Sequence, residues 1–160
     1  MTKNEIYEYL DSLGIEFELF EHEAVFNMAE LENIALPHPE CEAKNLFIRD
    51  EKKRNYYLIS VKGDKRIDLK EFRRKNNTKP LSFASEEDLK NILGLTPGSV
   101  TPLGLLCDEE RKVHFFLDSD FLDGIIGIHP NDNTATIYLK TEDLVKVIER
   151  HKNEVSFVSL

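Results

Sequence analysis

LFIRDEKKRNYYLISV, residues 46–61, contains two apolar runs separated by a charged segment. Leu46–Ile48 and Tyr56–Val61 are rich in aromatic and β-branched side chains, which favour strands. Arg49–Asn55 lies between them and has the polar composition of a turn. The stretch therefore predicts two neighbouring strands joined by a short connection.

A second pair of strands is predicted towards the C-terminus. Ile125–Ile128 and Thr134–Leu139 are both apolar, and Asn131–Asn133 supplies turn residues between them. The remaining predicted strands are Ile15–Phe20, an edge strand at Val155–Val158, and a hairpin of Leu105–Leu106 and Val113–Leu117 around Asp108–Lys112.

Helices are predicted at irregular intervals between these strands. Thr2 and Glu5 have the spacing of a capping box, and apolar residues follow at helical spacing until Gly14. The other predicted helices are Asn27–Ile34, Asp68–Lys75, Ser85–Gly94 and Thr141–Arg150. A regular alternation of strand and helix is absent. We therefore expect an α+β fold, a single domain over residues 1–160 with a mixed, mostly antiparallel sheet flanked by helices.

The composition, with 41% hydrophobic and 32% charged residues, is that of a globular protein in solution. No apolar run approaches the ~20 residues that span a bilayer, and the first residues lack the basic-then-apolar order of a secretory signal. Cys41 and Cys107 have no metal-ligand spacing, so we expect reduced thiols that behave as small buried side chains. The chain is expected to be cytoplasmic, with no membrane partner.

The net charge of −9 argues against a protein that coats nucleic acid indiscriminately, but the charge is unevenly distributed. Between Lys62 and Lys79, eight basic and three acidic residues give +5, whereas the rest of the chain carries −14. Such a patch could hold a few phosphate groups, and a solvated helix face is the alternative. The basic residues that we single out are Lys65, Arg66, Lys70, Arg73, Arg74 and Lys75.

The chain has seven glycines and six prolines, and five of these thirteen residues lie in the stretch Gly94–Gly104. Proline fixes φ and glycine permits positive φ, so their alternation predicts a rigid loop of defined shape. Such a loop can turn backbone N–H groups towards a ligand, and Gly98–Pro102 is the part most suited to this. A purely structural turn is the alternative.

Two other motifs place polar residues beside apolar strands. Lys44 and Asn45 precede Leu46–Ile48, and His129 follows Gly127–Ile128. Taken singly, each has a structural explanation, a solvated lysine or a histidine satisfied within a turn. The five histidines lack the spacing of a metal site, and no phosphate-binding glycine motif or nucleophile elbow occurs. We expect neither a metal nor a cofactor.

The motifs occur together, and in the same order, in one known family. They are Glu21–Phe26 with His22, Lys44–Phe47, Asp64–Lys70, Ala84–Leu89 leading to Gly98–Pro102, and Gly127–Pro130 followed by Asn131 and Thr134. On these motifs the chain resembles the YbaK-like prolyl-tRNA editing domains, which deacylate mischarged tRNA. The resemblance covers nearly the whole chain. It is greatest to the freestanding members, which remove alanine from tRNA for proline.

The resemblance implies hydrolysis of an aminoacyl ester on the terminal ribose of tRNA. The family's lysine is functionally essential, and Lys44 matches it. We expect Lys44 to hold a phosphate or the developing oxyanion, backbone N–H groups around Gly98 to bind the carbonyl side, and His129 to orient the substrate or a water. The further residues expected to bind the substrate are His22, Asn45, Ser99, Val100, Thr101, Pro102, Gly127 and Ile128.

The resemblance also implies a substrate and partners. A small pocket excludes large side chains by steric clash, which predicts alanyl-tRNA for proline, with the cysteinyl ester as the nearest competitor. A non-catalytic module that binds tRNA or a synthetase is the rival interpretation. The expected partners are tRNA and prolyl-tRNA synthetase. Two departures from the family, at Pro37–Cys41 and at Leu103 in place of a frequent aromatic residue, concern the pocket that measures the amino acid.

Overall fold

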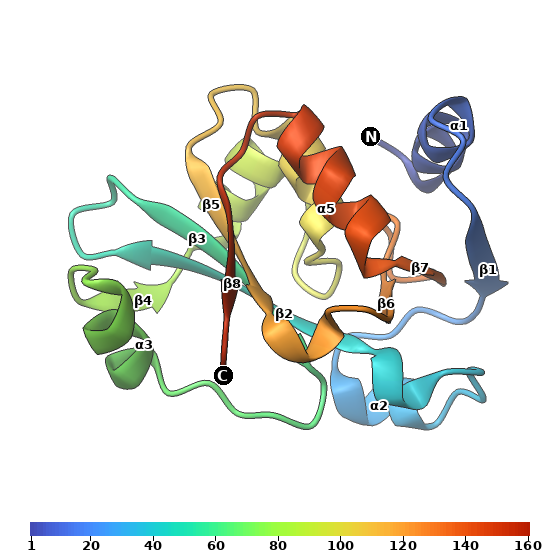
Figure 1. Cartoon of the computed structure of the whole chain (residues 1–160), viewed down its shortest axis with the longest axis horizontal. Coiled ribbons are helices and arrows are strands. Elements are labelled where there is room, and N and C mark those ends of the chain that lie inside the picture. Colours follow the sequence, from blue (N-terminus) through green and yellow to red (C-terminus); the bar gives the residue numbers. More distant parts are fainter.

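Two β-sheets form the frame of the molecule (Figure 1). The computed structural model describes residues 1–160. The smaller sheet is antiparallel and has the order β1 (Phe17–Glu21), β7 (Ala135–Lys140), β6 (Ile125–Ile128). The larger sheet has the order β4 (Leu81–Phe83), β2 (Ala43–Asp50), β3 (Tyr56–Lys62), β5 (Val113–Asp118), β8 (Val155–Val158).

Both predicted strand pairs are confirmed. β2 and β3 are antiparallel, with Lys44 opposite Val61, and β6 and β7 are antiparallel, with Gly127 opposite Tyr138. The alternation of side chains along β2 explains why its apolar residues serve two cores. Phe47 belongs to the larger core and Ile48, its neighbour, to the smaller core on the opposite face.

The hairpin predicted at Leu105–Leu106 and Val113–Leu117 is wrong. Pro102–Cys107 forms a 3₁₀-helix, η3, and β5 lies between β3 and β8, parallel to both. The Thr101 side chain accepts a hydrogen bond from the Leu103 N–H, and Pro102 occupies the first helical turn. These two residues start a helical turn that a short apolar pair does not reveal. The larger sheet is therefore mixed, and the α+β class is confirmed.

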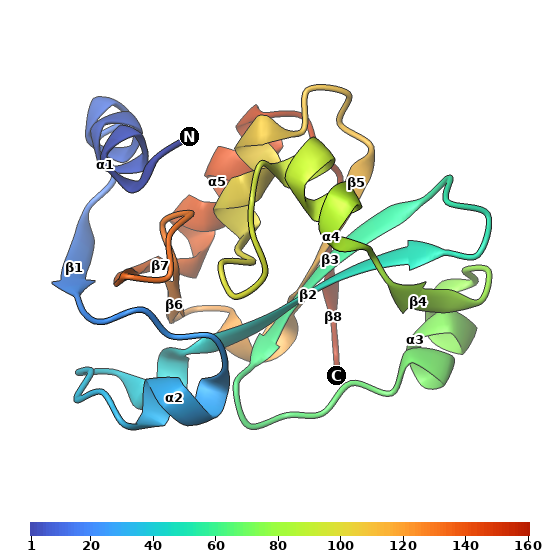
Figure 2. The ribbon, with the colours of Figure 1, turned by 180° about the vertical axis from the view of Figure 1, so that it is seen from behind.

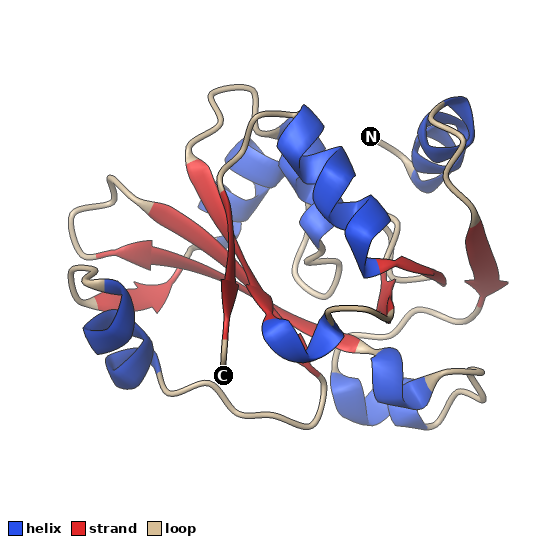
Figure 3. Cartoon of the chain, in the orientation of Figure 1, coloured by secondary structure: helices blue, strands red, loops and turns tan.

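Helices lie around the strands without regular alternation (Figure 3). The helical elements are α1 (Lys3–Ser12), α2 (Met28–Glu32), η1 (Pro39–Cys41), α3 (Leu69–Asn76), α4 (Glu86–Asp88) continued by the π-helical η2 (Leu89–Leu93), η4 (Ser119–Phe121) and α5 (Thr141–Arg150). The capping box predicted at Thr2 is present, Ser85 forms a second one on α4, and Asp68 is the N-cap of α3. None of the helices combines the length and apolarity needed to cross a membrane.

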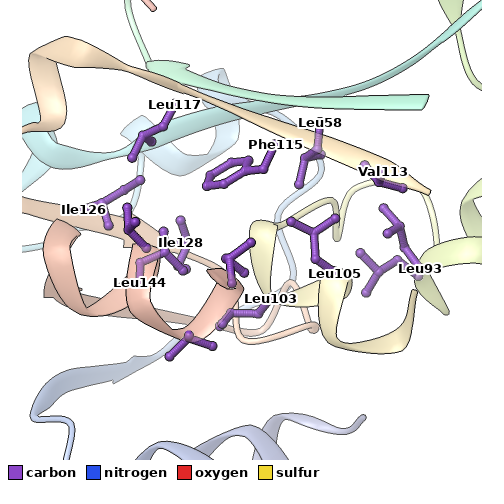
Figure 4. Close-up of a cluster of buried hydrophobic side chains, with 14 of the residues drawn as sticks. Leu58, Leu93, Leu103, Leu105, Val113, Phe115, Leu117, Ile126, Ile128 and Leu144 are labelled. Atoms are coloured by element: carbon purple, nitrogen blue, oxygen red, sulfur yellow. The ribbon is translucent and has the colours of Figure 1, made fainter. Parts of the chain in front are cut away.

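The larger core lies where α5 and η3 pack on the sheets. Leu103 and Leu105 of η3, Phe115 of β5 and Leu144 of α5 converge there (Figure 4). On the opposite face of the larger sheet, α3 inserts its only buried residue, Phe72. The helices α2 and α3 lie at opposite ends of the molecule (Figure 2).

Candidate active site

A pocket of about 250 Å³ lies where the start of β2 meets β6. A parallel bridge between Glu42 and Gly127 joins the two sheets at this point. The residues that line the pocket are Val25, Phe26, Asn27, Met28, Leu31, Glu42, Ala43, Lys44, Asn45, Leu46, Gly98, Val100, Gly127, Ile128 and His129. All three predicted motifs therefore share one pocket, which we call the β2–β6 pocket.

Lys44 is the cation of the β2–β6 pocket. The β2–β3 ladder holds its backbone opposite Val61, and the side chain is half-buried. Its ammonium makes no hydrogen bond and no ion pair within the chain. Lys44 thus has a positive charge available for a ligand in the pocket.

Asn45 connects the sheet to the Gly98–Pro102 loop. Its Nδ2 donates a hydrogen bond to the Val100 carbonyl at 3.3 Å, and its Oδ1 accepts one from the Ser60 hydroxyl. Both ends of the amide are therefore engaged within the fold. Asn45 positions the loop as well as lining the pocket.

The Gly98–Pro102 loop forms one wall of the pocket. Gly98 has φ +89°, and a Cβ there would lie 2.9 Å from the Phe26 ring, so glycine is required on both grounds. The backbone N–H groups of Gly98, Val100 and Thr101 donate to no acceptor within the chain, whereas that of Ser99 donates to the Thr96 carbonyl. Gly98 and Val100, which line the pocket, therefore have backbone N–H groups without an acceptor in the chain.

Three of the predicted substrate-binding residues stand behind this wall instead of lining the pocket. Ser99, Thr101 and Pro102 are all buried, and the Thr101 hydroxyl donates to the His129 carbonyl at 2.7 Å. The departures from the family pattern also lie elsewhere. Leu103 is fully buried in the larger core, and no residue of Pro37–Cys41 lines the pocket.

His129 presents one ring nitrogen without a partner. Its Nδ1 lies 2.9 Å from the Ala135 carbonyl. Since a carbonyl only accepts hydrogen bonds, the proton is on Nδ1 and Nε2 carries a lone pair. Burial of the ring lowers the pKa of His129, which keeps it neutral near pH 7.

His22 lies near His129 but does not line the pocket. The two ring centroids are 6.2 Å apart. His22 Nδ1 lies 2.7 Å from the Glu23 carbonyl, and its Nε2 lies 2.8 Å from the Thr136 hydroxyl. The first contact places the proton on Nδ1, so Nε2 accepts from Thr136. Both nitrogens are occupied, so His22 is a neighbour of the site and not part of its lining.

Glu42 is a pocket residue that the sequence analysis missed. Its carboxyl is only 5% exposed, and Oε1 accepts a hydrogen bond from the Tyr138 hydroxyl. Burial raises the pKa of Glu42 to about 7, although the Tyr138 hydrogen bond opposes this shift. The sequence did offer one indication of this. Glu42 comes two residues before Lys44, and in an extended chain residues two apart place their side chains on the same face.

Gly127 is needed because of Glu42. A Cβ at Gly127 would lie 2.6 Å from the Tyr138 ring and 3.0 Å from Glu42 Oε2. Only a hydrogen leaves room for the carboxyl and the phenol to pair beside β6. The glycine of the Gly127–Pro130 motif thus serves the pocket wall.

The basic residues of α3 lie away from the pocket, whereas Lys65 lines an adjoining cavity that shares Glu42 with it. β2 runs from Lys44 to Asp50, next to β4, and α3 packs near β4 at that end. Six steps along a strand amount to roughly 20 Å. Arg66, Lys70, Arg73, Arg74 and Lys75 are exposed, but Lys65 Nζ lies 2.9 Å from the buried Asp118 carboxylate and also pairs with Asp120. No three His, Cys, Asp or Glu side chains come together as a metal site.

Comparison with known proteins identifies the family. Residues 22–147, which include the whole pocket lining, match the model of the aminoacyl-tRNA editing domain. The chain belongs to the aminoacyl-tRNA editing family. It is accordingly an enzyme of the aminoacyl-tRNA deacylase class, and the predicted resemblance is confirmed.

Relatives of this editing domain are similar over most of their length. The prolyl-tRNA editing protein ProX of Acetoanaerobium sticklandii is 38% identical over 99% of this chain and 98% of its own. The prolyl-tRNA synthetase associated domain-containing protein 1 of Mus musculus is 36% identical over 88% of this chain and 86% of its own. A crystal structure of a proposed trans-editing enzyme for prolyl tRNA synthetase shares the fold, with a TM-score of 0.74 at 20% identity, covering 99% of this chain and 95% of that one.

Proposed function

We propose that this deacylase edits tRNA for proline in trans, and that its substrate is the alanyl ester. The names of the relatives, which refer to prolyl-tRNA editing or to prolyl-tRNA synthetase, support the tRNA. The size and lining of the pocket support alanine as the amino acid. At about 250 Å³ it is smaller than the ~300–1,000 Å³ common for ligand sites, and much of its lining is aliphatic. Alanine suits such a space, and we propose that Val100 and Ile128 limit the size of the side chain that enters it.

The observation that carries the hydrolytic role is that Lys44, Gly98, Val100 and His129 line one pocket. An aminoacyl ester is already activated, so positioning and charge stabilisation are the main requirements. His129 Nε2 accepts a proton as a water oxygen bonds to the carbonyl carbon. The Lys44 ammonium and the free loop N–H groups stabilise the oxyanion. The bond to the ribose oxygen then breaks, and that oxygen takes the proton from His129.

Deacylation of alanyl-, cysteinyl-, seryl- and prolyl-tRNA for proline tests the proposal. We expect the alanyl ester to be hydrolysed at least tenfold faster than the others. Lys44→Ala should lower kcat about 10²–10³-fold, the usual loss for one oxyanion donor, while exposed Lys146→Ala on α5 leaves it unchanged. Faster hydrolysis of the cysteinyl ester would overturn the substrate. If the protein binds tRNA but hydrolyses none of the esters, it is a non-catalytic tRNA-binding module.

The whole of residues 1–160 is proposed to act as one editing domain. Ile6 and Leu10 of α1 and Ile148 of α5, which lie outside residues 22–147, belong to the same core as η3. The reaction is placed in the cytoplasm, where aminoacyl-tRNA is made. The partners we propose are the acceptor arm of tRNA and, for delivery of the substrate, prolyl-tRNA synthetase.

A further inference from the structure

The Glu42 carboxyl is a buried pocket group to which the hydrolytic steps assign no role. Tyr138 holds Oε1, while Oε2 has no hydrogen-bond partner in the chain. The backbone is fixed as well, because the Glu42 carbonyl accepts from the Gly63 N–H and the residue bridges to Gly127. The free oxygen is therefore held at a defined place in the pocket wall.

The pocket is lined by one acidic and one basic side chain that do not pair with each other. Glu42 and Lys44 both line it, but they form no ion pair. An aminoacyl ester of a nucleotide has a matching distribution, with an α-ammonium on the amino acid and negative charge on the oxyanion and phosphate. Because Lys44 is assigned to the negative group, the carboxylate is left for the positive one.

We infer that Glu42 Oε2 accepts a hydrogen bond from the α-ammonium of the aminoacyl group and thereby orients the ester between Lys44 and His129. The inference rests on the proposed function. It makes the free α-amine part of what the enzyme recognises. Esters whose amine is acylated or replaced, such as peptidyl-tRNA or a hydroxy-acid ester, lose this contact.

The surroundings of Glu42 agree with a cationic ligand. Desolvation, followed by the nearby Glu40, raises the pKa of Glu42 and outweighs the Tyr138 hydrogen bond and His38, which lower it; the His38 ring lies 4.9 Å from the Tyr138 ring and its Nε2 lies 3.2 Å from Glu18. Burial raises the pKa of Glu42, so the carboxylate form is disfavoured until a cation joins it. The bound ammonium supplies that cation.

The test compares two esters on the same tRNA, the alanyl ester and the lactyl ester, in which an uncharged hydroxyl replaces the ammonium. Glu42→Gln keeps the shape of the side chain and its contact with Tyr138 but removes the charge. We expect it to lower kcat/KM about 10–100-fold for the alanyl ester and by less than about threefold for the lactyl ester. Glu149→Gln, at an exposed residue of α5 outside the pocket lining, is the matched control and should change neither.

Tyr138→Phe provides a second variant if Glu42→Gln folds poorly. It frees the carboxyl without removing it, and we expect a loss of about 3–10-fold that is again confined to the alanyl ester. Equal losses on both esters, or none on either, would overturn the role of Glu42. If the wild type hydrolyses no aminoacyl ester, the proposed function itself fails, and that result is distinct from either outcome.

Discussion

Gly127 and Gly124 lie three residues apart and offer a matched pair of substitutions. A Cβ at Gly127 meets Tyr138 and Glu42, whereas a Cβ at Gly124 has only the Phe121 carbonyl at 3.7 Å, an ordinary contact. We expect Gly127→Ala to reduce the free energy of unfolding by about 1–3 kcal/mol, typical of overpacking, and Gly124→Ala to stay within about 0.5 kcal/mol. Urea unfolding measures both. A Gly127→Ala variant with wild-type stability would show that the Tyr138 ring can move aside freely.

The charge of Glu42 should also be visible in stability. Its pKa rises from 4.5 to about 7 in the folded protein, so folding disfavours the carboxylate. Stability from this group is present below about pH 4.5 and is lost as the pH rises to about 7. We therefore compare the free energy of unfolding of Glu42→Gln with that of the wild type. The difference should shift in favour of the variant by up to about 3 kcal/mol as the pH rises from 5 to 8, and urea unfolding measures it. Comparing the two proteins at each pH cancels the contributions of groups that do not interact with Glu42. A gain that does not change with pH would contradict the raised pKa.

At the scale of single residues, sequence motifs identify groups whose type is unusual for their place. Lys44 and His129 stand beside apolar strands, and Gly98 lies in a loop crowded with glycine and proline. Glu42 could not be recognised in this way, because Glu40, two residues earlier, looks the same in sequence. Their difference is burial, and burial depends on Tyr138, which lies 96 residues further on.

Among the elements, α3 is the one whose role is still a prediction. Its basic side chains are exposed, and Arg74 and Lys75 share one carboxylate, Glu71, at 3.6 and 3.4 Å. Exposed pairs of this kind contribute little, so the charge remains available to phosphates. At roughly 20 Å from the pocket, α3 would contact the acceptor stem and not the terminal nucleotide.

Reversing the charge of Arg73, Arg74 and Lys75 to Glu should raise KM for aminoacyl-tRNA about tenfold or more and leave kcat nearly unchanged, because the contact contributes equally to ground and transition states. The slope of log(kcat/KM) against log[salt] should become shallower by about three. Lys146→Glu with Arg150→Glu on α5 is the control for a general effect of charge. An unchanged KM would mean that α3 is a solvated face.

Local signals predicted most elements because their causes are local. The capping boxes of α1 and α4 each act within four residues, and the two antiparallel pairs form across short turns. β5 was assigned the wrong neighbour because its partners, β3 and β8, are distant in sequence. Parallel pairing depends on which surfaces pack together; β3 and β8 occupy both positions beside β5, and η3 contributes Leu103 and Leu105 to the core.

For the whole molecule, apolar periodicity and caps in the amino-acid sequence are enough to establish the α+β class, most elements, and the polar residues worth considering. The pocket itself depends on long-range contacts. Its lining comes from four segments, within 25–31, 42–46, 98–100 and 127–129, and these meet where the Glu42–Gly127 bridge joins the two sheets. That packing also determines which atoms are free, namely His129 Nε2 and Glu42 Oε2. It places α3 at a distance from these two atoms. Each depends on burial and hydrogen-bond partners that are many residues away, and no local pattern records them.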